Sequence, residues 1–145
     1  MTVNRILVPV DFSDHSKRAL ECAKTLAQKF DASLHLLTVV PNPFVLPSPG
    51  PLYVPLPTDY LEGLRRDAES QIGGLLTADE RALFRAESAV VFGDPSTEIA
   101  DYASRANIDL VVMGTHGRSG VAHMVLGSVA ERVVRTMSCP VVTVH

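Results

Sequence analysis

Two kinds of hydrophobic pattern alternate along this chain. Five short apolar runs predict β-strands at residues 4–10, 33–40, 86–92, 108–113 and 141–144. These runs are continuous rather than alternating between apolar and polar residues, which is typical of parallel strands that are covered on both faces. The pattern therefore predicts a parallel sheet with helices on each side.

Between the strands, apolar residues recur every three or four positions, which predicts amphipathic helices. The first helix follows Ser13, a predicted N-cap, and the second begins at Thr58 and is weakened by glycines at 73 and 74. A third follows the N-cap Asp94, with Pro95 at its first position, and the fourth begins at about Ser128. We count four helices.

Strands and helices that alternate in this way predict a doubly wound α/β fold of Rossmann-like type, with strand order 3-2-1-4-5 and helices on both faces. A chain of 145 residues suits one domain, 1–145. Segment 41–57 holds seven of the ten prolines, so it is predicted to be a variable loop that is neither helix nor central strand.

In such sheets a ligand binds at the carboxyl ends of the strands, where the strand order reverses. That point lies between the first strand, ending in Pro9, Val10 and Asp11, and the fourth, running through Met113 into Gly114. Asp11 can accept hydrogen bonds from a ribose hydroxyl or an exocyclic amine, or it can cap the following helix beside Ser13. The residues alone leave both roles open.

Four of the nine glycines lie in residues 114–128, between the fourth strand and the last helix. Their spacing is Gly114-x2-Gly117-x9-Gly127-Ser128. Glycine permits a close approach to a ligand, and the first amides of a helix suit phosphate oxygens. The spacing favours an anion site over a flexible connection that happens to be rich in glycine.

Composition narrows the function further. The net charge of −3, with dispersed lysines and arginines, argues against a nucleic-acid partner, and no apolar stretch is long enough to cross a membrane. Cys22 and Cys139 lack the spacing of a disulfide framework or zinc site, which fits a cytoplasmic protein. His15, His35 and His145 are far apart in sequence and are interpreted as structural or exposed.

Three segments carry a family resemblance: Ile6-Leu-Val-Pro-Val-Asp11-Phe-Ser, Gly93-Asp-Pro-Ser-Thr-Glu-Ile, and the glycine spacing after residues 109–114. The chain resembles the universal stress protein family, specifically its ATP-binding branch, over its whole length. The resemblance implies that Asp11 lies near adenosine, Val39 near adenine, Gly114 and Gly117 near ribose and phosphates. The phosphates would be held by Gly127, Ser128 and Val129.

Further candidate contacts are the strand-end residues Pro9, Val10 and Met113, and the loop residues His116 and Arg118. Mg²⁺ or Mn²⁺ would accompany ATP, held mainly by the phosphates and water. The family commonly forms homodimers through the last strand, here 141–144, which would cover a sheet edge. The alternative is a monomer in which that edge is protected differently.

No catalytic residue is recognisable. The Walker lysine is missing, and no paired carboxylate accompanies His116, His123 or Arg118, whose ordinary roles are to support the loop or to lie in solvent. We therefore expect a dimeric regulatory or stress-response module that binds ATP. A slow ATP hydrolase or phosphotransferase, and an interaction scaffold independent of nucleotide, stay as alternatives.

Overall fold

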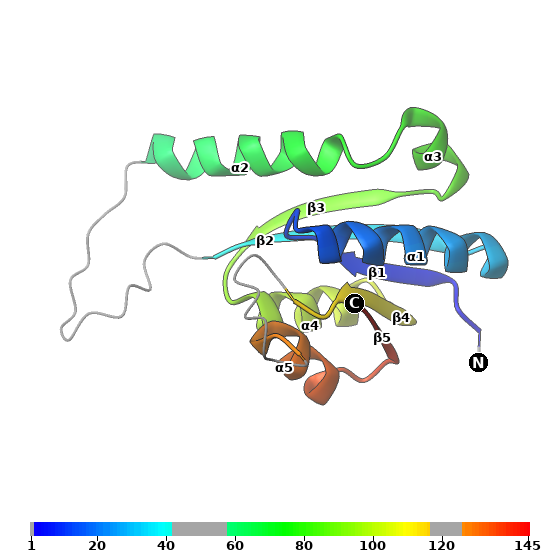
Figure 1. Ribbon diagram of the computed structural model, residues 1–145. Helices are drawn as coiled ribbons and strands as arrows, with labels where there is room; N and C mark the ends of the chain where they lie inside the picture. Colours follow the sequence, from blue (N-terminus) through cyan, green and yellow to red (C-terminus); the bar gives the residue numbers. More distant parts are fainter. Residues whose placement is uncertain (1, 42–57, 117–125) are drawn as a thin grey trace.

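The computed structural model describes residues 2–41, 58–116 and 126–145. Within them the chain forms β1 (Arg5–Pro9), α1 (Asp14–Phe30), β2 (Ser33–Val40), α2 (Thr58–Gly73), α3 (Ala78–Leu83), β3 (Glu87–Phe92), α4 (Pro95–Arg105), β4 (Leu110–Gly114), α5 (Ser128–Thr136) and β5 (Val141–Val144). Neighbouring strands are parallel, in the order β3-β2-β1-β4-β5. The predicted fold class and strand order are confirmed (Figure 1).

Helix α1 shows how the local sequence sets its own boundaries. The Ser13 hydroxyl accepts a hydrogen bond from the Ser16 amide at 3.2 Å, which satisfies one of the unpaired amides of the first turn. The helix ends at Asp31, whose left-handed conformation (φ 53°) stops the helical path. Its buried face is formed mainly by small residues, which let the helix lie close to the sheet: Ser16, Ala19, Leu20, Ala23 and Ala27.

The prediction of four helices was wrong, because the short helix α3 was missed. Helix α2 ends at Gly73, and Thr77 then begins a new helix through a capping box. In that box the Glu80 amide donates to the Thr77 hydroxyl at 3.2 Å, and the Glu80 carboxylate accepts from the Thr77 amide at 2.8 Å. The threonine and glutamate spacing was readable in the sequence, but six residues are too few to show a helical period.

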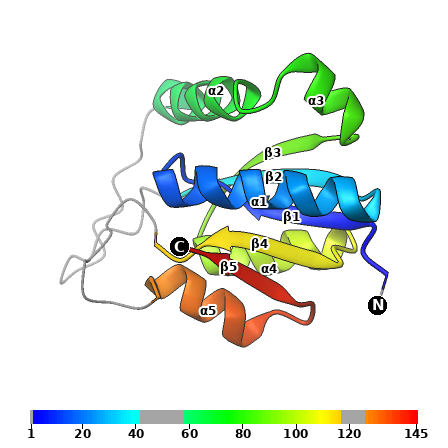
Figure 2. The ribbon, with the colours of Figure 1, turned by 45° about the vertical axis from the view of Figure 1, so that its right-hand side comes forward.

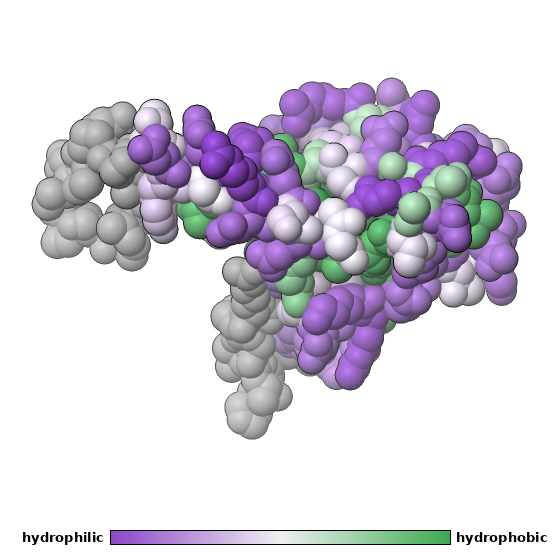
Figure 3. All heavy atoms as spheres, turned by 90° about the horizontal axis from the view of Figure 1, so that it is seen from above, coloured by the Kyte–Doolittle hydropathy of each residue, from purple (hydrophilic) through white to green (hydrophobic). Residues whose placement is uncertain are grey.

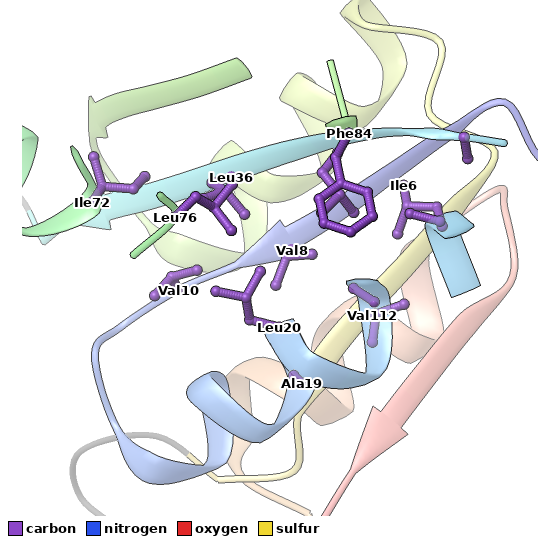
Figure 4. Close-up of a cluster of buried hydrophobic side chains, with 14 of the residues drawn as sticks. Ile6, Val8, Val10, Ala19, Leu20, Leu36, Ile72, Leu76, Phe84 and Val112 are labelled. Atoms are coloured by element: carbon purple, nitrogen blue, oxygen red, sulfur yellow. The ribbon is translucent and has the colours of Figure 1, made fainter. Parts of the chain in front are cut away.

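The helices cover both faces of the sheet. Helices α1, α2 and α3 lie over one face, and α4 and α5 lie over the other (Figures 1 and 2). Successive residues of β1 enter opposite cores: Ile6 and Val8 point toward α1, whereas Leu7 points toward α4 and α5. All three are fully buried, which explains the continuous apolar runs of the sequence. Figure 4 shows the core on the α1 side.

Hydrophilic side chains dominate the face that carries α2 and α3. Smaller groups of hydrophobic side chains are visible among the hydrophilic ones (Figure 3). Among the described helices, none combines the length and apolar character needed to span a bilayer. The proline-rich segment 42–57 and the loop 117–125 lie outside the described residues, so the predicted role of segment 41–57 stays a prediction.

Candidate functional site

A cavity of about 470 Å³ opens at the carboxyl ends of the strands, between β1 and β4. This is the point where the strand order reverses, and the volume falls in the range of roughly 300–1,000 Å³ that is usual for small-molecule sites. Ten of the predicted contacts line it: Pro9, Val10, Asp11, Val39, Met113, Gly114, His116, Gly127, Ser128 and Val129. The other two, Gly117 and Arg118, lie outside the described residues.

The turn between β1 and α1 forms one wall. One carboxylate oxygen of Asp11 accepts hydrogen bonds from the Ser13 amide, at 3.0 Å, and from the Ser13 hydroxyl. Between them Phe12 adopts a left-handed conformation with φ 66°, which is uncommon for a residue other than glycine. Asp11 therefore supports the Ser13 cap, as one of the two roles left open by the sequence would have it, and it also lines the cavity.

Apolar residues of two strands form the inner wall, and α2 adds residues that the sequence analysis missed. Val10 and Val39 come from the ends of β1 and β2, and the Thr38 hydroxyl donates to the Val10 carbonyl at 3.1 Å. Helix α2 contributes Leu64 and Asp67 to the lining. The helical pattern identified the apolar face of α2, but it does not tell which turn of a helix reaches the edge of the sheet.

Gly114 and Thr115 join the end of β4 to the neighbouring segments. A Cβ added at Gly114 would lie 2.8 Å from the Cβ of His15, so glycine is needed for the close packing of α1 on β4. Thr115 is buried, its amide donates to the Val144 carbonyl at 2.9 Å, and its carbonyl accepts from the Gly127 amide at 2.7 Å. Thr115 thus fixes where β5 and α5 lie, a role that no motif signalled.

The N-terminus of α5 faces the cavity without a side-chain cap. Gly127 is its N-cap, and within the described residues no side-chain cap hydrogen-bonds the amides of the first turn. The first intrahelical bond runs from the Glu131 amide to the Gly127 carbonyl at 2.9 Å. The amides of Ser128, Val129 and Ala130 precede it, so together with the positive end of the helix dipole they form an anion-binding arrangement.

Charged side chains add little positive charge to this cavity. The described residues that line it include two carboxylates, Asp11 and Asp67, but no lysine or arginine. At the nearby start of α4, hydrogen bonds from Ser96 and Thr97 lower the pKa of Asp94, which also pairs with Arg132 at 3.6 Å. Backbone amides are therefore the main groups in the described lining that could bind an anion.

The histidines are not scattered as the sequence suggested. His15, His116 and His145 lie together, with ring centroids 5.4 to 5.9 Å apart. His35 stands apart from them, with Nδ1 at 3.1 Å from the Tyr102 hydroxyl, and burial lowers its pKa. His145 is exposed, as predicted, but nothing in the sequence indicated that the fold brings positions 15, 116 and 145 together at one edge of the sheet.

Known proteins resemble this chain along its full length. Residues 2–145 match the model of the universal stress protein family. The universal stress protein MJ0531 of Methanocaldococcus jannaschii is 34% identical over 97% of this chain and 81% of its own length. Universal stress protein UspA from Lactobacillus plantarum has a TM-score of 0.76 at 26% identity, covering 100% of this chain and 99% of its own.

A universal stress protein solved in complex with cAMP covers 100% of this chain and 98% of its own, with a TM-score of 0.63 and 26% identity. The sheet order described above and the match over residues 2–145 lead to the same assignment. The chain belongs to the universal stress protein family.

Proposed function

We propose that this protein is a nucleotide-binding regulatory module that holds ATP in the cavity between β1 and β4. The observation that carries the proposal is the uncapped N-terminus of α5, which faces a cavity at the reversal of strand order. The glycine spacing supports it, as does the relative solved in complex with cAMP, which is also an adenine nucleotide.

The lining suggests how ATP would lie. Val10, Val39 and Met113 offer an apolar surface for the adenine ring, and Pro9 adjoins them at the end of β1. Asp11 would accept a hydrogen bond from the ribose, because it lines the cavity and its carboxylate is an acceptor. Gly114 and His116 would lie near the ribose and the phosphates. Gly117 and Arg118 are the other candidates for this part of the site, and they lie outside the described residues.

The phosphates would lie against the first turn of α5. The Ser128 and Val129 amides, and the Ser128 hydroxyl, are donors suited to phosphate oxygens, and Gly127 places no side chain in front of them. The carboxylates of the described lining, Asp11 and Asp67, repel the triphosphate, which favours an added positive charge. We propose that Mg²⁺ or Mn²⁺ supplies it, bound mainly by the phosphates and water.

The ligand that copurifies with the protein tests this proposal. Protein purified without added nucleotide is denatured by heat, and the supernatant is analysed by chromatography and mass spectrometry. We expect ATP at a substantial fraction of the protein concentration, and none from the variant Gly127→Asp purified in parallel. Release of a ligand without phosphate, in equal amount from both proteins, would contradict the proposal.

A second assay separates a nucleotide-binding module from an enzyme. Protein stripped of nucleotide is incubated with ATP and Mg²⁺, and ADP is followed over minutes to hours. We expect no more than slow turnover, because no described group in the cavity pairs a general base with a positioned nucleophile. Many turnovers per minute would make the protein an ATP hydrolase.

We also propose a homodimer through β5. This strand is at the edge of the sheet, next to β4 alone, and its four residues are only partly buried. The carbonyl of Pro140 accepts a hydrogen bond from Val111 in β4, and that of Val144 accepts one from Thr115, directly after β4. Because backbone groups alternate between the two sides of a strand, the amide of Thr143 points to the open edge. Thr143→Pro removes that donor and leaves the bonds to β4 intact.

Sedimentation velocity tests the dimer with this pair of variants. We expect the wild type and Thr143→Val to sediment as dimers and Thr143→Pro to sediment as a monomer with an unchanged circular dichroism spectrum. A dimer that persists in Thr143→Pro would place the interface elsewhere.

A further inference from the structure

Three imidazole rings meet beside the cavity, each from a different segment. His15 lies in the first turn of α1, His116 follows β4, and His145 follows β5. One ring nitrogen from each histidine lies within 4.8 Å of the other two. Since these positions are separated by 101 and 29 residues in sequence, their meeting depends on the fold and not on a local turn.

The backbone around the rings holds these segments in place. Gly114 lets α1 approach so closely that even a methyl group there would collide with His15. The hydrogen bond from the Thr115 amide to the Val144 carbonyl, at 2.9 Å, places the C-terminal His145 beside the end of β4. The three rings are therefore carried by segments with fixed relative positions.

Thr115 also orients two of the rings through its hydroxyl. Its Oγ1 lies 3.1 Å from Nδ1 of His145 and 3.1 Å from Nδ1 of His116. An N–H donated by each ring to this oxygen would put the lone pair of the ring on Nε2, the state in which neutral imidazole binds a metal ion. A buried hydroxyl that orients two imidazoles is the kind of supporting contact found around metal-binding histidines.

The third ring contains a buried nitrogen that the described residues do not satisfy. Nδ1 of His15 is shielded from solvent, and no hydrogen-bond partner for it lies in the described part of the chain. A buried polar atom without a partner is costly, so such atoms are uncommon in folded proteins. A metal ion among the three rings would give the His15 imidazole a ligand role.

We propose that His15, His116 and His145 bind a transition-metal ion of the Zn²⁺ class. Neutral imidazole is a ligand for Zn²⁺, Ni²⁺, Co²⁺ and Cu²⁺, whereas Mg²⁺ and Ca²⁺ require oxygen ligands. Three histidines around zinc leave a fourth position for water or another ligand. This site differs in ligand chemistry from the Mg²⁺ that would accompany ATP, and it does not depend on nucleotide binding.

The three ligand nitrogens must move slightly closer together to bind an ion. Zinc–nitrogen bonds of about 2.0–2.1 Å in a tetrahedral site place the ligand nitrogens about 3.4 Å apart. Side-chain rotation can bring nitrogens within 4.8 Å to that spacing while the backbone stays in place. The bound ion would link His15, at the start of α1, to His145, which follows β5. His116 lines the cavity, so the ion would lie beside the cavity.

Metal titration without nucleotide tests the site. Protein without a polyhistidine tag is treated with a chelator, desalted and titrated with ZnCl₂ by calorimetry, and with CoCl₂ by visible absorption to report the coordination. We expect one Zn²⁺ per chain and a cobalt spectrum typical of a four-coordinate site with three nitrogen ligands. His145→Gln should lower the zinc affinity at least tenfold, and His15→Gln should do the same.

His145→Gln is the decisive variant, because His145 is exposed and its replacement leaves the core unchanged. The control is the double variant Cys22→Ser, Cys139→Ser, which removes the two free thiols as competing zinc ligands and should bind as the wild type does. No saturable zinc binding by the wild type would overturn the proposal. Unchanged zinc affinity in His145→Gln, or its loss in the cysteine variant, would overturn it as well.

Discussion

Helices α1 and α5 both begin at the cavity, but their first turns are satisfied differently. At α1 the Ser13 hydroxyl accepts from the Ser16 amide, and Asp11 in turn accepts from Ser13. At α5 the N-cap is Gly127, which has no side chain to accept anything. The protein itself completes the first turn of α1, whereas the first turn of α5 can be completed by a ligand.

The remaining helices strengthen this contrast. Asp94 caps α4 and Thr77 caps α3 by accepting from amides of the first turn, so of the helices whose N-caps are described, α5 alone lacks a side-chain cap. Compared with a polar cap, glycine at the N-cap loses only about a few tenths of a kcal/mol, so the first-turn amides of α5 stay open at a small cost in stability. We infer that the first-turn amides of α5 are available to bind an anion.

The largest expected effect comes from giving α5 the cap of α4. In Gly127→Asp the new carboxylate can accept from the first-turn amides and repels phosphate, so ATP affinity should fall about 100-fold or more. The unfolding temperature without nucleotide should stay equal or rise. Calorimetry with ATP and Mg²⁺, and a thermal melt, measure the two effects.

Gly127→Ser is the matched control, because it introduces a neutral cap that does not repel phosphate. It should lose clearly less affinity than the aspartate variant. If Gly127→Asp binds ATP like the wild type, the phosphates do not lie at this terminus.

Removing the carboxylate at the other helix should have a smaller effect. Asp11→Ala deletes one acceptor to the ribose; because Asp11 is only half-buried, this charge-assisted hydrogen bond should be worth about 1.5 kcal/mol, so ATP affinity should fall about tenfold. Inorganic triphosphate, which lacks the ribose, should bind equally to both proteins. An unchanged ATP affinity would leave Asp11 with its capping role alone.

Removing the cap of α1 while keeping Asp11 separates the two roles of this turn. Ser13→Ala should lower the free energy of unfolding by about 1 kcal/mol and change ATP affinity little. Urea denaturation and calorimetry give both quantities. If Ser13→Ala weakens ATP binding as much as Asp11→Ala, the conformation of the turn matters for the ligand and the carboxylate does not.

The smallest expected effect concerns the cap of α3. Lys24 and the Thr77 amide hold the pKa of Glu80 down, to about 2 from 4.5. Because the folded value is depressed, the stabilising effect of this carboxylate is complete above about pH 4.5 and is lost as the pH falls toward 2. A carboxyl NMR titration should show this midpoint, and Lys24→Met should raise it. A midpoint near 4.5 in the wild type would contradict the contact.

Sequence patterns predicted most of the fold because the three central strands, β1, β2 and β4, are buried on both faces. Ile6 and Leu7 enter opposite cores, so the pattern of β1 is a continuous apolar run that marks a parallel sheet. Strand order then placed Asp11 and Gly114 at one reversal point, and both line the cavity. Local patterns were enough to predict the strand order, because the short, right-handed connections between parallel strands allow only a few topologies.

The parts that escaped prediction depend on contacts between distant segments. Thr115 orients the ring of its neighbour His116 and that of His145, and the contact with position 145 is not visible from the sequence around residue 115. Asp67 reaches the cavity through the placement of α2, which a helical period does not encode. The histidine cluster was missed for the same reason, since local spacing is the only metal-site signal that a single sequence offers.

The most direct test of the central claim is an amide NMR titration of nucleotide-stripped protein with ATP and Mg²⁺. We predict that the amide resonances of Ser128, Val129 and Ala130 shift more than those at the capped start of α4, with further shifts around Asp11. ATP binding that leaves these three α5 amides unperturbed would contradict the account, because the uncapped terminus would then not be the phosphate site.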